Sequence, residues 1–230
     1  MQPFPKITTG AIGVREQLEL LGLTPEDLIE AIRFGESHRA LCTPDDPPSY
    51  HGVTAWARTV RGLRIGKLRH ENWTKDDCGN YSTIVNPDKS LAIAVVTGDD
   101  ATGIFDTAKP FSQPKLKYTK GNKTREAVER NSLNPFLFDD MAADARAKLA
   151  QIEAAENRTT WMLLRRRKKD TVYAELSLPW KFSDAGQVSS WKHRIILDPM
   201  DVEPILEMLD DSGNDSGDVI DVPVQRISNP

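Results

Sequence analysis

The sequence feature that most constrains the fold is an unbroken apolar run, residues 91–96, in the second half of a predicted β-hairpin. The run has the length of a strand, and its lack of alternation between apolar and polar residues predicts burial on both faces. Residues 81–85 form the preceding strand, and the Asn-Pro-Asp-Lys segment between them, residues 86–89, has the composition of a turn. We therefore expect a hairpin at the centre of a sheet with other elements packed on each face.

Helical patterns precede the hairpin. Residues 14–21 place apolar side chains on one face, and Thr24 followed by Pro25 is typical of the start of a second helix. We expect that helix to end at Gly35, since glycine is common just after a helix. A third helix is predicted over 51–68. Its apolar stripe consists of Val53, Trp56, Val60 and Leu63.

The second half of the chain alternates irregular and regular segments. Residues 104–122 contain two prolines and little periodicity, which indicates a long irregular connection. Helices are predicted over 123–131, 139–156 and 201–209. Three strands of an antiparallel meander are predicted over 159–166, 171–178 and 191–197. The expected fold class is α+β, with N-terminal helices, a central buried hairpin and a C-terminal antiparallel meander in a mixed or antiparallel sheet.

Charge is unevenly distributed along the chain. The net charge is −4, but residues 198–221 hold nine acids and no lysine or arginine, so residues 1–197 carry a net charge of +4. We expect residues 1–209 to form a compact α+β domain, with a candidate subdomain boundary near residue 135. Residues 210–230 are predicted to be an acidic disordered tail with a short terminal segment, through which a protein partner could bind.

The composition argues against a membrane protein and against a secreted protein. No apolar run approaches the roughly 20 residues that a transmembrane helix needs. The N-terminal residues lack the apolar core of a signal peptide. The two cysteines, Cys42 and Cys78, show no spacing typical of a metal site. These features predict a cytoplasmic protein with no membrane partner.

The loop that follows the buried strand, residues 97–103 (Thr-Gly-Asp-Asp-Ala-Thr-Gly), is one candidate site. Loops after buried strands often carry function, because the sheet fixes the backbone on either side. The carboxylates of Asp99 and Asp100 are the ligand type that Mg²⁺ prefers. The same residues are typical of a plain turn, which is the favoured interpretation because the sequence identifies no further acidic ligand. Mg²⁺ therefore belongs to an alternative interpretation, and the main expectation is a protein without a cofactor.

Three stretches carry basic residues without any acid: 51–69, 109–125 and 165–169. Each alone is typical of a solvated face, but if they converge they form a surface that binds phosphate groups with salt-dependent affinity. The helix start beside Lys120 adds backbone N–H groups that attract anions. Aromatic side chains that could stack on bases are Trp73, Phe111, Tyr118 and Trp180. The candidate phosphate-binding or nucleic-acid-binding residues are Arg58, Arg61, Lys115, Lys117, Lys120, Lys123, Arg125, Arg165, Arg166 and Arg167.

Three segments carry a resemblance: NPDKSLAIAVVTGDDATG, KGNKTREAVERN and, upstream of both, AWARTVRGLR. They resemble a family of uncharacterised bacterial proteins that are often found on prophages and other mobile elements. The resemblance covers about a third of the chain. It implies a setting on mobile DNA and implies no particular activity.

The leading hypothesis is a nucleic-acid-associated accessory protein, not an enzyme, of a bacterial mobile-element or defence/anti-defence system. It would bind the phosphate backbone of DNA or RNA through the basic surfaces. One alternative is a metal-dependent phosphoester hydrolase or nuclease that uses the 97–103 loop. Another is a protein-interaction or inhibitor module that acts through residues 104–122 or the C-terminal tail. We predict that a functional surface lies where the 97–103 loop meets the basic stretch 109–125.

Overall fold

The computed structural model describes residues 4–108, 112–133 and 158–202. Its α-helices are α1 (Ala11–Glu19), α2 (Pro25–Ala40), α3 (Tyr50–His70) and α4 (Asn122–Leu133), and a 3₁₀ turn, η1, spans Cys78–Asn80. Its strands are β1 (Lys6–Thr8), β2 (Thr74–Asp76), β3 (Thr83–Val85), β4 (Leu91–Thr97), β5 (Thr159–Lys168), β6 (Thr171–Phe182), β7 (Val188–Ile196) and β8 (Met200–Asp201).

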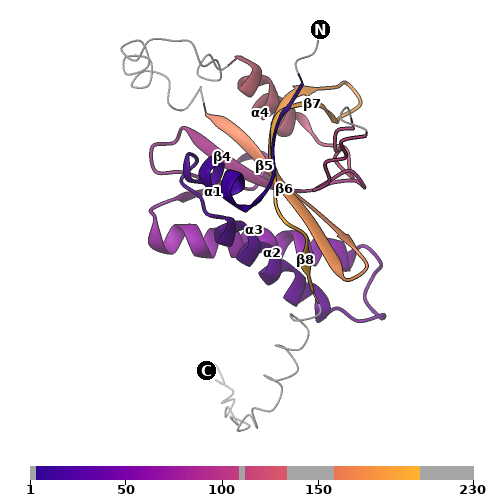
Figure 1. Ribbon diagram of the computed structural model, residues 1–230. Coiled ribbons are helices and arrows are strands. Elements are labelled where there is room, and N and C mark those ends of the chain that lie inside the picture. The colour runs from indigo at the N-terminus through magenta and orange to yellow at the C-terminus, as the bar shows by residue number, and fades with distance from the viewer. Residues whose placement is uncertain (1–3, 109–111, 134–157, 203–230) are drawn as a thin grey trace, which may run out of the picture.

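The strands form one mixed sheet that runs through the centre of the molecule (Figure 1). The strand order is β1-β7-β6-β5-β4-β3-β2, and β8 pairs with β6. Neighbouring strands are antiparallel except for two parallel pairs, β1 with β7 and β4 with β5. Strands from before and after residue 135 therefore pair directly within one sheet. The α+β class, the central hairpin and the C-terminal meander are confirmed.

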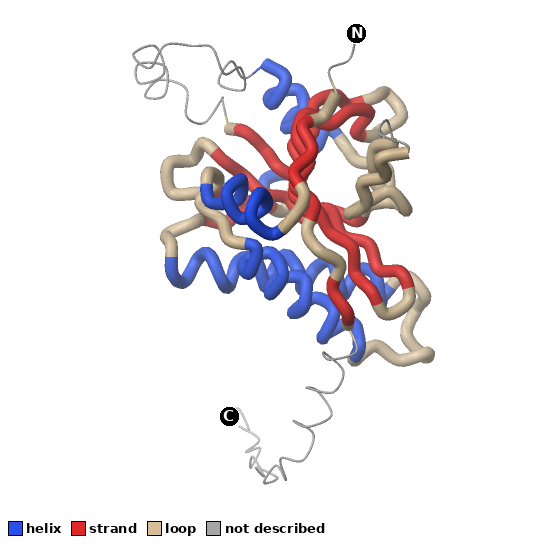
Figure 2. Tube along the Cα trace, viewed as in Figure 1, coloured by secondary structure: helices blue, strands red, loops and turns tan. Residues whose placement is uncertain are grey.

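The central hairpin owes its position to burial on both faces of β4. Six consecutive residues of this strand, from Leu91 to Val96, are buried. Leu91, Ile93 and Val95 belong to the larger core, which β4 shares with α1, α2 and α3. Val96 faces the opposite way, into a second core that contains Val128 of α4. The sheet is thus covered by α1–α3 on one face and by α4 on the other, as the tube drawing shows (Figure 2).

Helix α2 starts where the sequence predicted, but it ends later. Thr24 and Asp27 form a reciprocal capping box, and Pro25 occupies the first turn. The helix then runs through Gly35 to Ala40, so the predicted end at Gly35 is wrong. Gly35 instead lies at the contact between α2 and α3, where the two helices approach closely.

Two other expectations about apolar side chains are wrong. Val53 on α3 is 53% exposed, although Val60 and Leu63 of the same predicted stripe are buried. Trp73 is only 4% exposed and packs in the larger core, so it is not available to stack on a base. Phe111 lies outside the described residues.

The C-terminal meander is longer than predicted. Strands β5 and β6 are joined by a tight turn in which Lys169 adopts a positive φ of 54°. The predicted start of the helix over 201–209 is wrong, because Asp201 belongs to strand β8. Residues 203–209, the helix predicted over 139–156 and the acidic tail lie outside the described residues. None of the helices in the described ranges is long and apolar enough to cross a membrane.

Candidate anion-binding pocket

The loop after β4 and the basic stretch lie side by side. The Lys117 N–H donates to the Thr97 carbonyl and the Asp99 N–H donates to the Lys115 carbonyl, both at 2.9 Å. These bonds continue the sheet past the end of the short strand β3, whose pairing with β4 reaches only to Ala94. The structure therefore brings together the two segments between which the sequence analysis placed a functional surface.

A cavity of about 630 Å³ opens at this junction, and we call it the first cavity. Its walls come from the start of α3, the end of β4 with Gly98, residues 117–120 and the end of β5. No acidic residue lines the first cavity, at least among the described residues. The lysines and arginines that line it are Arg39, Lys117, Lys120, Arg165, Arg166 and Arg167.

Two of these arginines share one buried carboxylate. Arg165 and Arg167 lie on the α2 side of the sheet, where Glu36 accepts from both guanidinium groups, from Arg167 at 3.0 Å. Glu36 is only 1% exposed, and a carboxylate this deeply buried needs such partners. Arg167 also lies 3.6 Å from the exposed Asp170 carboxylate, so the two arginines face one buried and one exposed acid. Burial lowers the pKa of Arg165 although Glu36 opposes this, and its Nε has no hydrogen-bond partner in the described part of the chain.

Arg166 lies on the opposite face of β5, because side chains alternate along a strand. Its Nη1 donates to the carbonyl of Asp100 and lies 3.4 Å from the Asp100 carboxylate. Its guanidinium also stacks on the Tyr173 ring, 4.8 Å from the centroid. Arg166 thus ties the 97–103 loop to β5 and forms part of the wall of the first cavity, with Asp100 as its acidic partner.

The remaining cations belong to the basic stretch and to α2. Burial lowers the pKa of Lys120, and its backbone N–H is fixed by the Gly186 carbonyl at 2.9 Å. Lys117 lies 5.7 Å from the centre of the Tyr118 ring, which is 58% exposed. Arg39 comes from the last turn of α2. A partly buried lysine and an exposed aromatic ring beside buried arginines form a site suited to an anion that carries an aromatic group.

The structure brings five of the ten predicted basic residues into the first cavity and leaves the other five outside its lining. Lys123 pairs with Glu126 at 2.8 Å, and Arg125 pairs with Asp184 at 3.2 Å. Arg61 stacks on Phe34 on the helical side. The residues outside the lining are Arg58, Arg61, Lys115, Lys123 and Arg125.

Arg39 and Glu36 were not among the site residues predicted from the sequence. Both lie on α2, a helix that carries charges of both signs, so neither stood out as part of an acid-free run. The spacing of Glu36 and Arg39 on one helix was the only signal, and it did not indicate that β5 would lie opposite.

Asp99 and Asp100, the candidate magnesium ligands, make other contacts. The Asp99 carboxylate accepts from the Ala101 N–H at 3.1 Å, as in an ordinary turn, and the Asp100 side chain is exposed beside Arg166. Within the described ranges, no group of three or more His, Cys, Asp or Glu side chains is placed to hold a metal ion. The magnesium site stays a prediction without an identified third ligand.

Comparison of the chain with protein-family models, with curated proteins and with solved structures found no match. The chemistry of the pocket is therefore the basis on which a function can be argued.

Proposed function

We propose that this chain is a cytoplasmic accessory protein without catalytic activity that binds DNA or RNA through the phosphate backbone, with the first cavity as the main contact. The observation that carries the proposal is the gathering of six lysines and arginines, and no acid, around a cavity of about 630 Å³. That volume exceeds a single phosphate and falls in the range of sites that hold a nucleotide-sized group. The mobile-element or defence setting rests on the resemblance of the sequence segments around the hairpin.

The charge of the first cavity favours an anion on energetic grounds. Burial lowers the pKa of Lys120, so a phosphate beside it would restore the stability of the ammonium form. The Arg165 Nε is buried and lacks a hydrogen-bond partner among the described residues, so its N–H is available to donate to a phosphate oxygen. Phosphate binding also releases the counterions condensed on a nucleic acid, which makes the affinity depend steeply on salt.

The test is fluorescence anisotropy with labelled DNA and RNA oligonucleotides over a series of salt concentrations. The variant Lys117→Ala/Lys120→Ala removes two cations that are not paired with Glu36, so the fold should remain intact. We expect weaker binding at every salt concentration and a log–log salt slope that is smaller by about 1 for each lysine removed.

A matched control removes the same charge elsewhere. Lys6 on β1 and Arg33 on the exposed side of α2 lie outside the first cavity. The variant Lys6→Ala/Arg33→Ala should retain the parent affinity within a small factor. Absence of binding to any oligonucleotide at low salt, or an equal loss in both double variants, would overturn the proposal.

A further inference from the structure

Two further cavities continue from the first one along the sheet. A second cavity of about 400 Å³ shares Trp56 and Lys120 with the first. A third cavity of about 260 Å³ shares Tyr81 and Lys123 with the second. We call this row of three neighbouring cavities the groove.

The groove passes strand β4 and crosses from the face of the sheet that carries α3, where the first cavity lies, to the face that carries α4, where the third cavity lies. Gly98 lines the first cavity, Val95 the second and Ala92 the third. Because a strand rises about 3.3 Å per residue, the six steps from Gly98 to Ala92 span about 20 Å. The groove is thus an extended feature with the length of several nucleotides rather than a site for one small ion.

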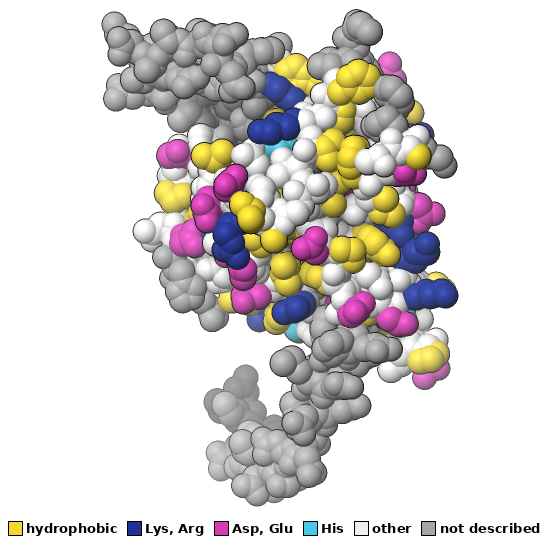
Figure 3. Space-filling view, viewed as in Figure 1, with side chains coloured by type: hydrophobic (Ala, Val, Ile, Leu, Met, Phe, Trp, Pro, Cys, Tyr) yellow, Lys and Arg dark blue, Asp and Glu magenta, His cyan; other side chains and the backbone are white. Residues whose placement is uncertain are grey.

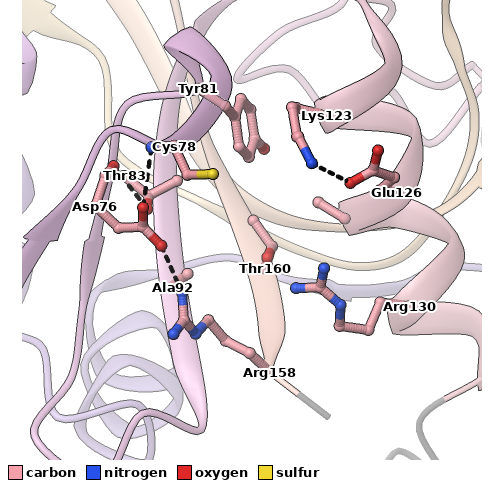
Figure 4. Close-up of a pocket in the computed structure, with 11 residues that line it drawn as sticks. Asp76, Cys78, Tyr81, Thr83, Ala92, Lys123, Glu126, Arg130, Arg158 and Thr160 are labelled. Atoms are coloured by element: carbon pink, nitrogen blue, oxygen red, sulfur yellow. Dashed lines mark hydrogen bonds and ion pairs between the residues drawn. The ribbon is translucent and has the colours of Figure 1, made fainter. Parts of the chain in front are cut away.

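Positive charge continues to the far end of the groove. In the third cavity, Arg130 of α4 points into the space between α4 and η1, while Arg158, just before β5, points toward Asp76 (Figure 4). The two acids there are already bound: Asp76 pairs with Arg158 at 2.9 Å and Glu126 pairs with Lys123 at 2.8 Å. The charge of Arg130 is therefore in excess over the acids that line this cavity.

The groove also contains a buried hydrogen-bond donor. The Tyr81 hydroxyl is buried between the second and third cavities and has no partner within the described residues. Burial raises the pKa of Tyr81, so the phenol stays protonated at neutral pH. An unpartnered buried hydroxyl costs free energy unless a ligand or water satisfies it.

We infer that the groove binds an extended single strand of DNA or RNA, with its phosphates on the cations of the three cavities and one base against Tyr118. This inference rests on the proposed function and specifies that the nucleic acid bound is single-stranded. A single strand presents unstacked bases that an exposed aromatic side chain can cover, and its backbone can follow a recessed positive path. A duplex keeps its bases stacked inside and its phosphates on two outer backbones. It therefore cannot enter a row of recessed cavities as deeply as a single strand can.

The test compares labelled oligothymidylates of about 3 and about 12 nucleotides with a duplex of the longer length. We expect the longer single strand to bind at least about tenfold more tightly than the duplex or the short strand. Tyr118→Ala should weaken binding of both single strands by about 5-fold to 100-fold through the loss of stacking. Arg130→Ala should weaken the longer strand and leave the short strand, which fills only the first cavity, unchanged. Arg33→Ala is the charge-matched control.

The outcomes separate this inference from the proposed function. Equal affinity for duplex and single strand overturns the inference and leaves phosphate-backbone binding standing. The inference is also overturned if Lys117→Ala/Lys120→Ala weakens binding as expected but Arg130→Ala does not weaken binding of the longer strand. That result would confine binding to the first cavity. No binding of any oligonucleotide overturns both. Circular dichroism of each variant shows whether a loss reflects unfolding.

Discussion

At the scale of single residues, a buried ion pair holds the loop that forms the first cavity. Glu175 on β6 and Arg194 on β7 are both almost fully buried, and Arg194 Nη2 donates to Glu175 Oε2 at 2.6 Å. The Gly103 N–H donates to the same carboxylate at 2.9 Å, and Arg194 also donates to the Ile104 carbonyl at 3.1 Å. The pair therefore connects the sheet to the C-terminal end of the turn after β4.

Glu175→Gln should destabilise the protein severely. The substitution keeps the shape of the side chain but leaves the Arg194 guanidinium buried without its counter-charge, which typically costs about 3–5 kcal/mol of unfolding free energy. Urea unfolding followed by circular dichroism measures the loss. Asp100→Asn, at an exposed carboxylate, is the control and should stay within about 0.5 kcal/mol of the parent. A loss below about 1 kcal/mol in Glu175→Gln would contradict a structural role for the pair.

His193 gives the stability a dependence on pH. Burial, with a smaller contribution from the charge of Lys6, lowers the pKa of His193 to about 4, and its Nε2 lies 3.0 Å from the Thr8 hydroxyl. Well above pH 6.5, the ordinary pKa of histidine, the ring is neutral in both the folded and the unfolded chain. As the pH falls toward 4, only the unfolded chain takes up the proton, so the unfolding free energy decreases.

The measurement is urea unfolding between pH 5 and pH 7 for the parent and for His193→Gln. The slope due to His193 should stay below about 1.4 kcal/mol per pH unit, reduced further because the ring is only partly buried and solvent screens its charge. The variant should lose that part of the slope. Parallel curves for the two proteins would show that His193 titrates in the folded state as it does in the unfolded state.

At the scale of elements, the contact between α2 and α3 determines where Glu36 and Arg39 meet β5. A Cβ atom added at Gly35 would lie 2.6 Å from the Ala55 carbonyl oxygen and would collide with the Thr59 hydroxyl. The absence of a side chain at Gly35 therefore allows the two helices to approach. Glu36, the next residue, is thereby brought against the end of β5.

Gly35→Ala should destabilise the protein by about 1–3 kcal/mol, because the added methyl group forces the two helices apart. Gly66→Ala is the matched control in α3, since a Cβ there meets nothing within 4 Å. That variant should be more stable than the parent by about 0.4–1 kcal/mol, because alanine lowers the entropy of the unfolded chain. Thermal unfolding of both variants gives the comparison. Similar effects from both changes would mean that the α2–α3 contact tolerates a side chain at Gly35.

The elements that could be predicted well from the sequence are those with strong local signals. Thr24 and Pro25 define a helix start by their own chemistry, and the apolar run 91–96 has no alternative to burial. Gly35 failed as a helix end because glycine gives the same local signal at a helix terminus and at a close helix contact. Only the position of α3 distinguishes the two, and that is a tertiary contact.

At the scale of the whole molecule, the first cavity depends on contacts between distant segments. The parallel pairing of β4 with β5 places Thr97 opposite Arg165, which brings the 97–103 loop beside the third basic run. No local pattern predicts that pairing, so the sequence could identify the basic runs and could not show which of them meet. On the face that carries α1, side chains of both charges are interspersed (Figure 3). The acid-free lining is therefore a feature of the first cavity and not of that surface.

The uneven charge of the whole chain leads to the last prediction. Residues 210–230 hold five acids and one arginine, so their removal changes the net charge from −4 to zero. A negative segment tethered to the protein repels a nucleic acid and competes for the same cations. We therefore expect a chain ending at residue 209 to bind an oligonucleotide several-fold more tightly at low salt. The difference should shrink as salt screens the charges.

A second variant separates charge from chain length. Replacing the five aspartates of the tail with asparagine keeps the length and removes the negative charge; these residues are Asp210, Asp211, Asp215, Asp218 and Asp221. If the tail acts through electrostatics, this variant should match the truncated chain in anisotropy titrations at each salt concentration. Weaker binding after truncation, together with parent-like binding of the asparagine variant, would instead indicate that the terminal segment itself contributes a contact. In that case the tail would belong to the binding surface rather than compete with it.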